Sequence, residues 1–151
     1  MIRSYGLHWH KDRVFWGHQN NSGSLMWPAS PNGRPVDFRK QRGIYALYAD
    51  YRLVYIGQTG SAQKDRLFDR LKSHLRDHLS ERWDRFSWLG TQWVIKESQL
   101  SVDTAKVSGE ISSILNILES TSIAISEPSL NLQRGRWGDC TQYYQLVSPD
   151  I

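Results

Sequence analysis

Cysteine is almost absent from this chain of 151 residues, in which Cys140 is the only one. A single cysteine cannot form a disulfide within the chain, and the usual cysteine spacings of zinc sites are missing. The first residues lack the apolar core of a signal peptide, and no later run reaches the ~18 apolar residues that a membrane helix needs. We therefore expect a soluble, cytoplasmic protein that does not contact a membrane.

Acidic residues are scarce in the first part of the chain. Residues 1–90 contain 15 Lys and Arg against 8 Asp and Glu, whereas residues 91–151 contain 4 against 7. Most of the basic residues are Arg, whose planar guanidinium suits phosphate oxygens. The surplus fits a polyanionic partner, and charge alone fits a solvated basic surface equally well.

The length predicts a single domain, residues 1–151. Residues 1–42 form an N-terminal extension, in which residues 5–17 are typical of a β-hairpin around a polar Lys11-Asp12 turn. Residues 19–35 are rich in Asn, Ser, Gly and Pro, which predicts a loop.

The centre of the chain predicts two antiparallel strands followed by a helix. Residues 43–48 and 53–59 are strand-like, and Asp50-Tyr51-Arg52 lies between them as a turn. Asp65 can cap a helix that ends near Trp83. Its apolar stripe recurs at four-residue spacing and consists of Leu67, Leu71, Leu75 and Leu79.

A third strand and a second helix complete the predicted fold. Residues 86–95 are aromatic and β-branched, with Gly90 as a candidate bulge. Ser108 can cap the second helix, and Pro128 ends it. The helix has a predicted apolar face of Ile111, Ile114, Leu115 and Leu118. A short closing strand is expected at 143–147. The fold class is α+β, with a small, mainly antiparallel, three-stranded sheet flanked by helices.

Two tripeptides lie in the central hairpin, Gly43-Ile44-Tyr45 in one strand and Tyr55-Ile56-Gly57 in the other. On the helix that follows, Arg66, Arg70 and His74 are four residues apart and form one ridge. Taken alone, such a ridge is more typical of a solvated helix flank than of a phosphate site, and strand tyrosines usually pack in a sheet.

Further along, Glu119 follows Leu118 at the edge of the apolar face, where a carboxylate is partly buried. Asn131 comes twelve residues later, in a Pro-x-x-Asn turn that begins at Pro128. Taken together, these motifs resemble the GIY-YIG nuclease family in kind and in order. Arg70 rather than Arg66 matches the family's Arg-x-x-x-His. The resemblance covers residues 43–131 and leaves 1–42 and 132–151 as extensions.

The resemblance implies a role for each matching residue. Tyr45 acts as general base or orients the attacking water, and His74 can accept its proton. Tyr55 orients water or phosphate, and Arg70 binds the scissile phosphate. Glu119 is the only protein ligand of one divalent cation per active site, Mg²⁺ or Mn²⁺.

Two further expectations concern Asn131 and Tyr45. Asn131 is implied to hold the loop next to the glutamate helix. A phenol of pKa ~10 is a weak base at neutral pH, so the metal, Arg70 or His74 must lower the effective pKa of Tyr45.

Contacts with the nucleic-acid backbone are expected from basic residues near these motifs. The candidates are Lys64, Arg66, Lys72, Arg134 and Arg136. Trp83, Trp88 and Trp93 can stack on bases, although core packing is the more common use of such residues.

Three functions remain open at this point. The first is a metal-dependent endonuclease that cleaves double-stranded DNA in restriction or phage defence. The second is a structure-specific repair nuclease that acts within a larger complex, and the third is a nucleic-acid-binding module without activity. Because one active site cuts one strand, double-strand cleavage implies a homodimer, a partner protein or two successive nicks.

Overall fold

The computed structural model describes residues 2–18, 22–28, 35–60, 65–95, 99–102, 105–126 and 128–131. Its strands are β1 (Ser4–His10), β2 (Met26–Pro28), β3 (Pro35–Asp37), β4 (Gly43–Ala49), β5 (Arg52–Gln58), β6 (Arg85–Gly90), β7 (Val94–Ile95) and β8 (Gln99–Leu100). Its helices are the short 3-10 helix η1 (Lys11–Arg13), α1 (Leu67–Ser73) and α2 (Ala105–Ser126). Four strands form an antiparallel sheet in the order β1-β6-β4-β5, and β2-β3 and β7-β8 form two small sheets. The predicted α+β class is confirmed.

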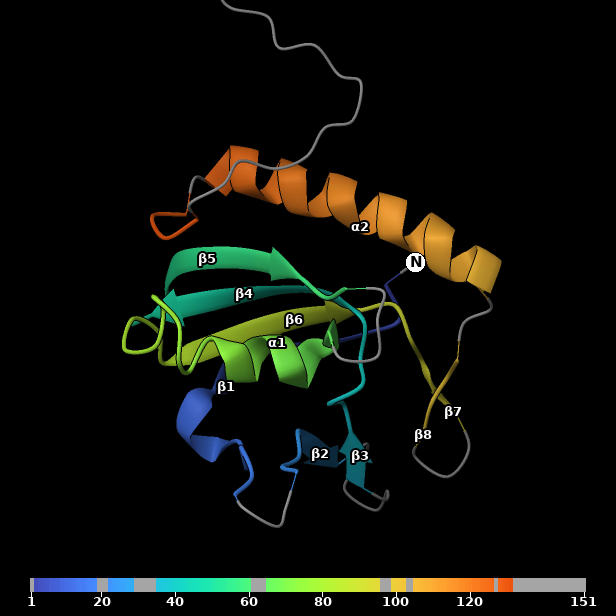
Figure 1. Cartoon of the computed structure of the whole chain (residues 1–151), viewed down its shortest axis with the longest axis horizontal. Helices are drawn as coiled ribbons and strands as arrows, with labels where there is room; N and C mark the ends of the chain where they lie inside the picture. Colours follow the sequence, from blue (N-terminus) through green and yellow to red (C-terminus); the bar gives the residue numbers. More distant parts are fainter. Residues whose placement is uncertain are drawn as a thin grey trace, which may run out of the picture.

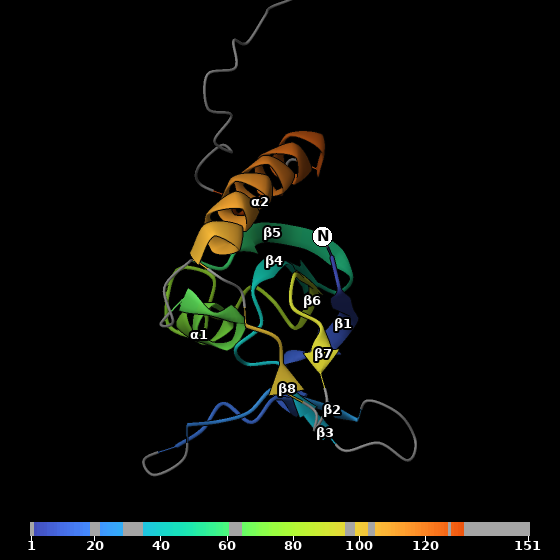
Figure 2. The same ribbon diagram turned by 90° about the vertical axis from the view of Figure 1, so that its right-hand side faces the viewer.

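The helices cover different parts of the main sheet. The short α1 packs against one face, where Leu67 and Leu71 join Tyr45 and Leu47 in the core (Figure 1). The long α2 runs along β5, at the sheet edge remote from β1, as both views show (Figures 1 and 2). The edge strand β5 thus lies between β4 and α2, and the Tyr45 side chain of β4 is fully buried.

The central hairpin forms as predicted, with a tighter turn. Asp50 and Tyr51 are the only residues between β4 and β5, and both have positive φ, 47° and 65°. Two such residues define a type I′ turn, whose twist matches that of paired strands. The register then places Tyr45 opposite Gly57 and Leu47 opposite Tyr55.

The predicted N-terminal hairpin is wrong. β1 pairs with β6 instead of with residues 14–16, so the sheet has four strands rather than three. The aromatic side chains explain the choice, because Trp9 packs edge-on against Trp88 with ring centroids 5.5 Å apart. Trp16 stacks on Phe68 at 5.5 Å. Each tryptophan thus packs against the core, where it buries more apolar surface than in an isolated hairpin.

The predicted loop at 19–35 also contains a strand. β2 lies within this segment and pairs with β3, which begins at its last residue, to form one of the small sheets. The Asp37 carboxylate accepts hydrogen bonds from the backbone N–H groups of Leu25 and Arg39, at 3.1 and 3.0 Å. Leu25 and Val36 are buried in the main core, so this extension is part of the domain.

The first helix is much shorter than predicted. It ends at Ser73, and Arg66 rather than Asp65 is its N-cap, without a side-chain capping bond. Turns replace the expected continuation because the Asp77 carboxylate accepts the Leu79 N–H at 2.8 Å and the Trp83 indole donates to the His74 carbonyl at 3.3 Å. Leu67, Leu71 and Leu79 are nevertheless buried. The leucine stripe predicted burial at three of its four positions, since Leu75 is only partly buried, and it did not predict the length of the helix.

The later elements also differ at their boundaries. β6 ends at Gly90 rather than near residue 95, and Gly90 forms no bulge there. A Cβ on Gly90 would lie 2.3 Å from the buried Gln41 amide carbon, so this position has room only for glycine. α2 begins at Ala105, which places Ser108 inside the helix rather than at its cap, and it ends at Ser126, before Pro128.

The predicted apolar face of α2 is narrower than expected. Leu115 is buried, whereas Ile114 is exposed. The strand expected at 143–147 lies outside the described residues. Among the described helices, none is both long and apolar enough to cross a membrane.

Candidate active site

The hairpin brings the phenol of Tyr45 over Gly57. Tyr45 is fully buried in β4, and Gly57 is its partner across the strands. A Cβ built on Gly57 would lie 2.6 Å from the Tyr45 hydroxyl oxygen and 2.8 Å from the Tyr55 ring. The absence of a side chain at Gly57 therefore gives both tyrosines the space that they occupy.

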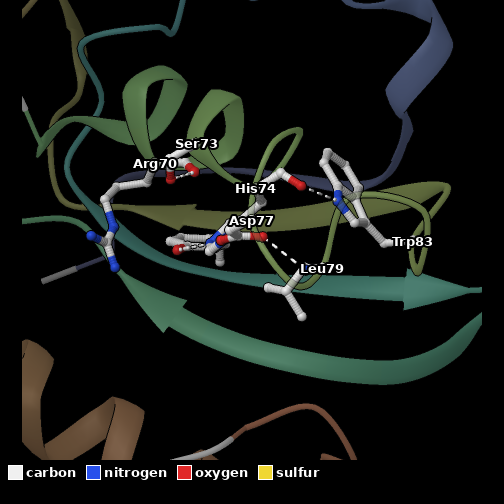
Figure 3. A network of polar contacts seen from close by, with 7 residues as sticks. Arg70, Ser73, His74, Asp77, Leu79 and Trp83 are labelled. Carbon is white, nitrogen blue, oxygen red and sulfur yellow. Dashed lines mark hydrogen bonds and ion pairs between the residues drawn. The ribbon is translucent and has the colours of Figure 1, made fainter.

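A chain of hydrogen bonds connects Tyr45 with the segment that follows α1. The Tyr45 hydroxyl is 2.7 Å from His74 Nε2, and His74 Nδ1 is 2.6 Å from Asp77 Oδ2. Figure 3 shows His74 and Asp77 side by side in this segment, with Arg70 extending from α1 toward the strands. His74 is buried at the end of α1, so the ring has little freedom to turn.

The direction of these hydrogen bonds follows from charge. The pKa of Asp77 lies below its ordinary value, because the hydrogen bonds from Leu79 and His74 outweigh the effect of burial. An ionised carboxylate only accepts, so His74 Nδ1 carries the proton. Burial lowers the pKa of His74, against the opposing effect of Asp77, and the neutral ring therefore has a lone pair on Nε2. Tyr45 is the donor to that lone pair.

The Tyr45 phenol is a weak acid in this environment. Burial raises its pKa above the ordinary value, and Tyr55 raises it further. The sequence led us to expect that the metal, Arg70 or His74 lowers this pKa; Arg70 does act in that direction, but burial outweighs it and the pKa of Tyr45 is raised. The protein residues alone thus leave Tyr45 protonated and hydrogen bonded to His74.

Two arginines at the start and middle of α1 have buried donor groups, and Arg70 acts electrostatically on both tyrosines. Nε of Arg70 and Nη1 of Arg66 are buried, and neither has a hydrogen-bond acceptor among the described residues. Burial acts to lower the pKa of Arg70, but Tyr45 and Tyr55 make the net shift upward. Buried cationic donors without acceptors are costly, so these groups suit an anion with several oxygen atoms.

The Tyr55 ring lies beside the hydrogen-bonded chain. Its ring centroid is 5.0 Å from that of His74 and 6.2 Å from that of Tyr45. Burial raises the pKa of Tyr55, Arg70 lowers it, and the charge of Glu119 raises it again. The charge of the partly buried Glu119 on α2 thus contributes to the electrostatic environment of Tyr55.

The position of α2 is set by contacts on both sides of Glu119. The Gln58 amide at the end of β5 donates to the Asn116 side chain at 2.6 Å. After the helix, Asn131 Oδ1 accepts the Ile56 N–H at 2.9 Å, and Asn131 Nδ2 donates to the Ile56 carbonyl at 2.8 Å. Asn131 thus pairs with β5 as a further strand residue would, and it holds the turn after α2 against the hairpin.

The donor atoms fit a hydrated hard cation. In the parts of the chain that the structure describes, no group of three or more His, Cys, Asp or Glu side chains is placed to hold a metal ion. Glu119 of α2 is a partly buried carboxylate whose charge acts on Tyr55, and Mg²⁺ often binds through one or two carboxylates while retaining several waters. This donor set suits Mg²⁺ or Mn²⁺ better than a four-ligand zinc site.

The remaining candidates are less closely connected to the site. The Lys72 ammonium lies over the Phe68 ring, 5.6 Å from its centroid. Trp83 and Trp88 are buried in the core, and Trp93 is half-exposed. The other three predicted contacts, Lys64, Arg134 and Arg136, lie outside the described residues.

Asp77 was missed by the sequence prediction. It occurs three residues after His74, a spacing that places two side chains on the same side of a helical turn. That spacing was the available signal, but the family motif ends at His74 and gave no reason to look further.

Comparisons with known proteins find no matching family model, curated protein or solved structure. The resemblance based on the motifs therefore stays a prediction.

Proposed function

We propose that this protein is a divalent-metal-dependent endonuclease of the GIY-YIG kind, which hydrolyses phosphodiester bonds of double-stranded DNA in restriction or phage defence. One observation carries the proposal: side chains from three elements, β4, β5 and the end of α1, gather around His74. Tyr45 of β4 is hydrogen bonded to His74 at the end of α1, with Tyr55 of β5 beside the ring. Glu119 of α2 acts electrostatically on Tyr55.

The charges at this site suit attack on a phosphate. The buried donors of Arg66 and Arg70 can bind phosphate oxygens and stabilise the negative charge that develops on them. Tyr45 orients the attacking water through its hydroxyl oxygen, and His74 provides a proton acceptor behind it. Glu119 would hold Mg²⁺ or Mn²⁺, which supplies positive charge to the phosphoryl and leaving oxygens when bound.

Cleavage of supercoiled plasmid in the presence of Mg²⁺ or Mn²⁺ tests the proposal. The wild type is compared with Glu119→Ala and with Glu110→Ala, an exposed residue on the same helix that serves as the matched control. We expect wild type and Glu110→Ala to cleave, and Glu119→Ala to lose at least ~10²-fold in rate.

Other outcomes identify the two alternative functions. Activity only on branched DNA, or only with added partner protein, would indicate a structure-specific repair nuclease. Retained DNA binding without cleavage of any of these substrates would indicate a binding module and would contradict the proposed activity.

A further inference from the structure

Asp77 uses both oxygens of its carboxylate in the segment after α1. Oδ2 lies 2.6 Å from His74 Nδ1, while Oδ1 accepts the backbone N–H of Leu79 at 2.8 Å. The side chain of His74 is only 5% exposed, whereas that of Asp77 is 34% exposed and reaches solvent. Leu79 thus holds the carboxylate in place, and the carboxylate holds the imidazole (Figure 3).

We propose that Asp77 is the positioning residue of a proton relay, Asp77–His74–Tyr45, in which it keeps the Nε2 lone pair of His74 directed at the Tyr45 hydroxyl. The inference rests on the proposed nuclease function and adds a residue that the motif does not contain. Asp77 acts through His74 and does not itself contact the reacting phosphate.

The relay accounts for each proton in hydrolysis. As the water oxygen forms its bond to phosphorus, the water proton passes to the Tyr45 oxygen and the phenol proton passes to His74 Nε2. The bond from phosphorus to the 3′ oxygen breaks, and the leaving oxygen takes a proton from solvent water. His74 later releases its extra proton, which neutralises the hydroxide left behind. The products are a phosphomonoester and a 3′-hydroxyl.

The relay explains how a buried phenol can take part in base catalysis. Tyr45 gains one proton as it loses another, so no phenolate has to form in a site where burial disfavours it. The positive charge develops instead on His74, next to the Asp77 carboxylate. Without Asp77, burial of the imidazole would oppose that charge.

The variant Asp77→Asn separates this role from a structural one. Its Oδ1 can still accept the Leu79 N–H, while its amide N–H₂ replaces the acceptor that faces His74 Nδ1. The ring must then carry its proton on Nε2, where it can no longer accept one from Tyr45. Asp69→Asn is the matched control, because Asp69 is exposed on α1 and its substitution removes the same charge.

Two measurements test the relay. The first is ¹⁵N NMR of the His74 ring, which needs no DNA. We expect a protonated Nδ1 in wild type, in Asp69→Asn and in Asp77→Glu, and a protonated Nε2 in Asp77→Asn. The second is cleavage rate against pH. At neutral pH, Asp77→Asn should lose roughly 10²–10⁴-fold, Asp77→Glu should recover part of it, and Asp69→Asn should stay within about twofold of wild type.

The acidic side of the pH profile shows in which direction Asp77 shifts the pKa of His74. Groups that face His74 are Tyr45, Tyr55, Arg70, Asp77 and His78. Of these, Asp77 raises the pKa of His74. In Asp77→Asn, the cleavage rate should therefore begin to fall at a lower pH than in wild type, and the maximal rate should also be lower.

The two readouts distinguish failure of the relay from failure of the function. A protonated Nε2 in wild-type His74, or an Asp77→Asn variant with unchanged rate and pH profile, would overturn the relay even if DNA is cleaved. The expected change of protonated nitrogen without cleavage by any variant would support the control of His74 by Asp77 and overturn the nuclease function.

Discussion

At the scale of single residues, the site first requires that Gly57 of β5 leaves room for the Tyr45 phenol. The Tyr45 phenol lies where any side chain at Gly57 would project, and from that position its hydroxyl is hydrogen bonded to His74. Gly57, which has no side chain, thus determines where the Tyr45 phenol lies.

Gly57→Ala is predicted to reduce activity more than stability. The added methyl would overlap the Tyr45 hydroxyl, which costs about 1–3 kcal/mol of unfolding free energy and displaces the phenol from His74. The control is Gly109→Ala in α2, where nothing lies within 4 Å of the added Cβ and a gain of about 0.5–1 kcal/mol is expected. Urea unfolding and plasmid cleavage measure both effects. Full activity in Gly57→Ala would contradict this account.

Burial of neutral His74 predicts a pH dependence of stability. Its pKa in the folded protein is below the ordinary value of about 6.5, so the unfolded chain binds the proton at higher pH than the folded one. The contribution of His74 to stability is therefore complete above about pH 6.5 and is lost as the pH falls toward its folded pKa.

Urea unfolding between pH 7.5 and 5 can detect this loss. The free energy of unfolding should fall less steeply with acidification in His74→Gln than in wild type. His78→Gln, which removes an exposed imidazole from the same segment, is the control. Equal slopes in wild type and His74→Gln would show that His74 is not buried as a neutral ring.

At the scale of elements, α2 is held to the hairpin on both sides of Glu119. Gln58 contacts Asn116 before it, and Asn131 pairs with Ile56 after it. Leu130 adds a backbone bond from its N–H to the Val54 carbonyl at 2.9 Å. These contacts satisfy part of the open edge of β5, so the same turn both covers the sheet and positions the carboxylate.

Asn131→Ala is predicted to loosen this attachment. It removes two neutral hydrogen bonds to Ile56, which together contribute about 1–3 kcal/mol. Cleavage should fall further than the folded fraction does, because the turn after α2, the helix that carries Glu119, is then less firmly attached to β5. Ser129→Ala, an exposed change in the same turn, is the control. Plasmid cleavage and urea unfolding provide the readouts, and equal cleavage by both variants would refute the role of the turn.

At the scale of the whole molecule, charge is distributed unevenly along the chain. The basic surplus lies in residues 1–90, which include the hairpin and α1, whereas residues 91–151 have an acidic surplus. The buried donors of Arg66 and Arg70 belong to the basic part. We therefore expect the DNA backbone to approach the molecule beside α1.

The logarithm of the DNA-binding constant should fall linearly with the logarithm of the salt concentration, because binding to phosphates releases counterions. Arg66→Ala should reduce the slope by about one for each phosphate that the arginine neutralises in the wild type. Arg52→Ala, an exposed change next to the β4–β5 turn, is the control and should change the slope less. Fluorescence anisotropy with labelled duplex DNA measures the slopes. Identical slopes for wild type and Arg66→Ala would contradict this placement of the DNA.

The sequence by itself determined the parts of the fold that depend on neighbouring residues. The strand-like pattern around a short polar turn specifies the β4–β5 hairpin, whereas the two-residue turn and the pairing of Tyr45 with Gly57 came from the structure. Apolar periodicity identified α2 and most of the buried leucines. These features were predictable because hydrogen bonds and side-chain spacing within a short segment determine them.

Only the tertiary structure decided the pairing of β1 with β6, the end of α1 at Ser73 and the contact of Asp77 with His74. Local patterns allowed a hairpin for the first and a longer helix for the second. The outcome depended on which partners bury the aromatic rings and satisfy the polar groups. Those partners lie far apart in the sequence, or in turns whose shape the surrounding core imposes, so local propensity does not encode them.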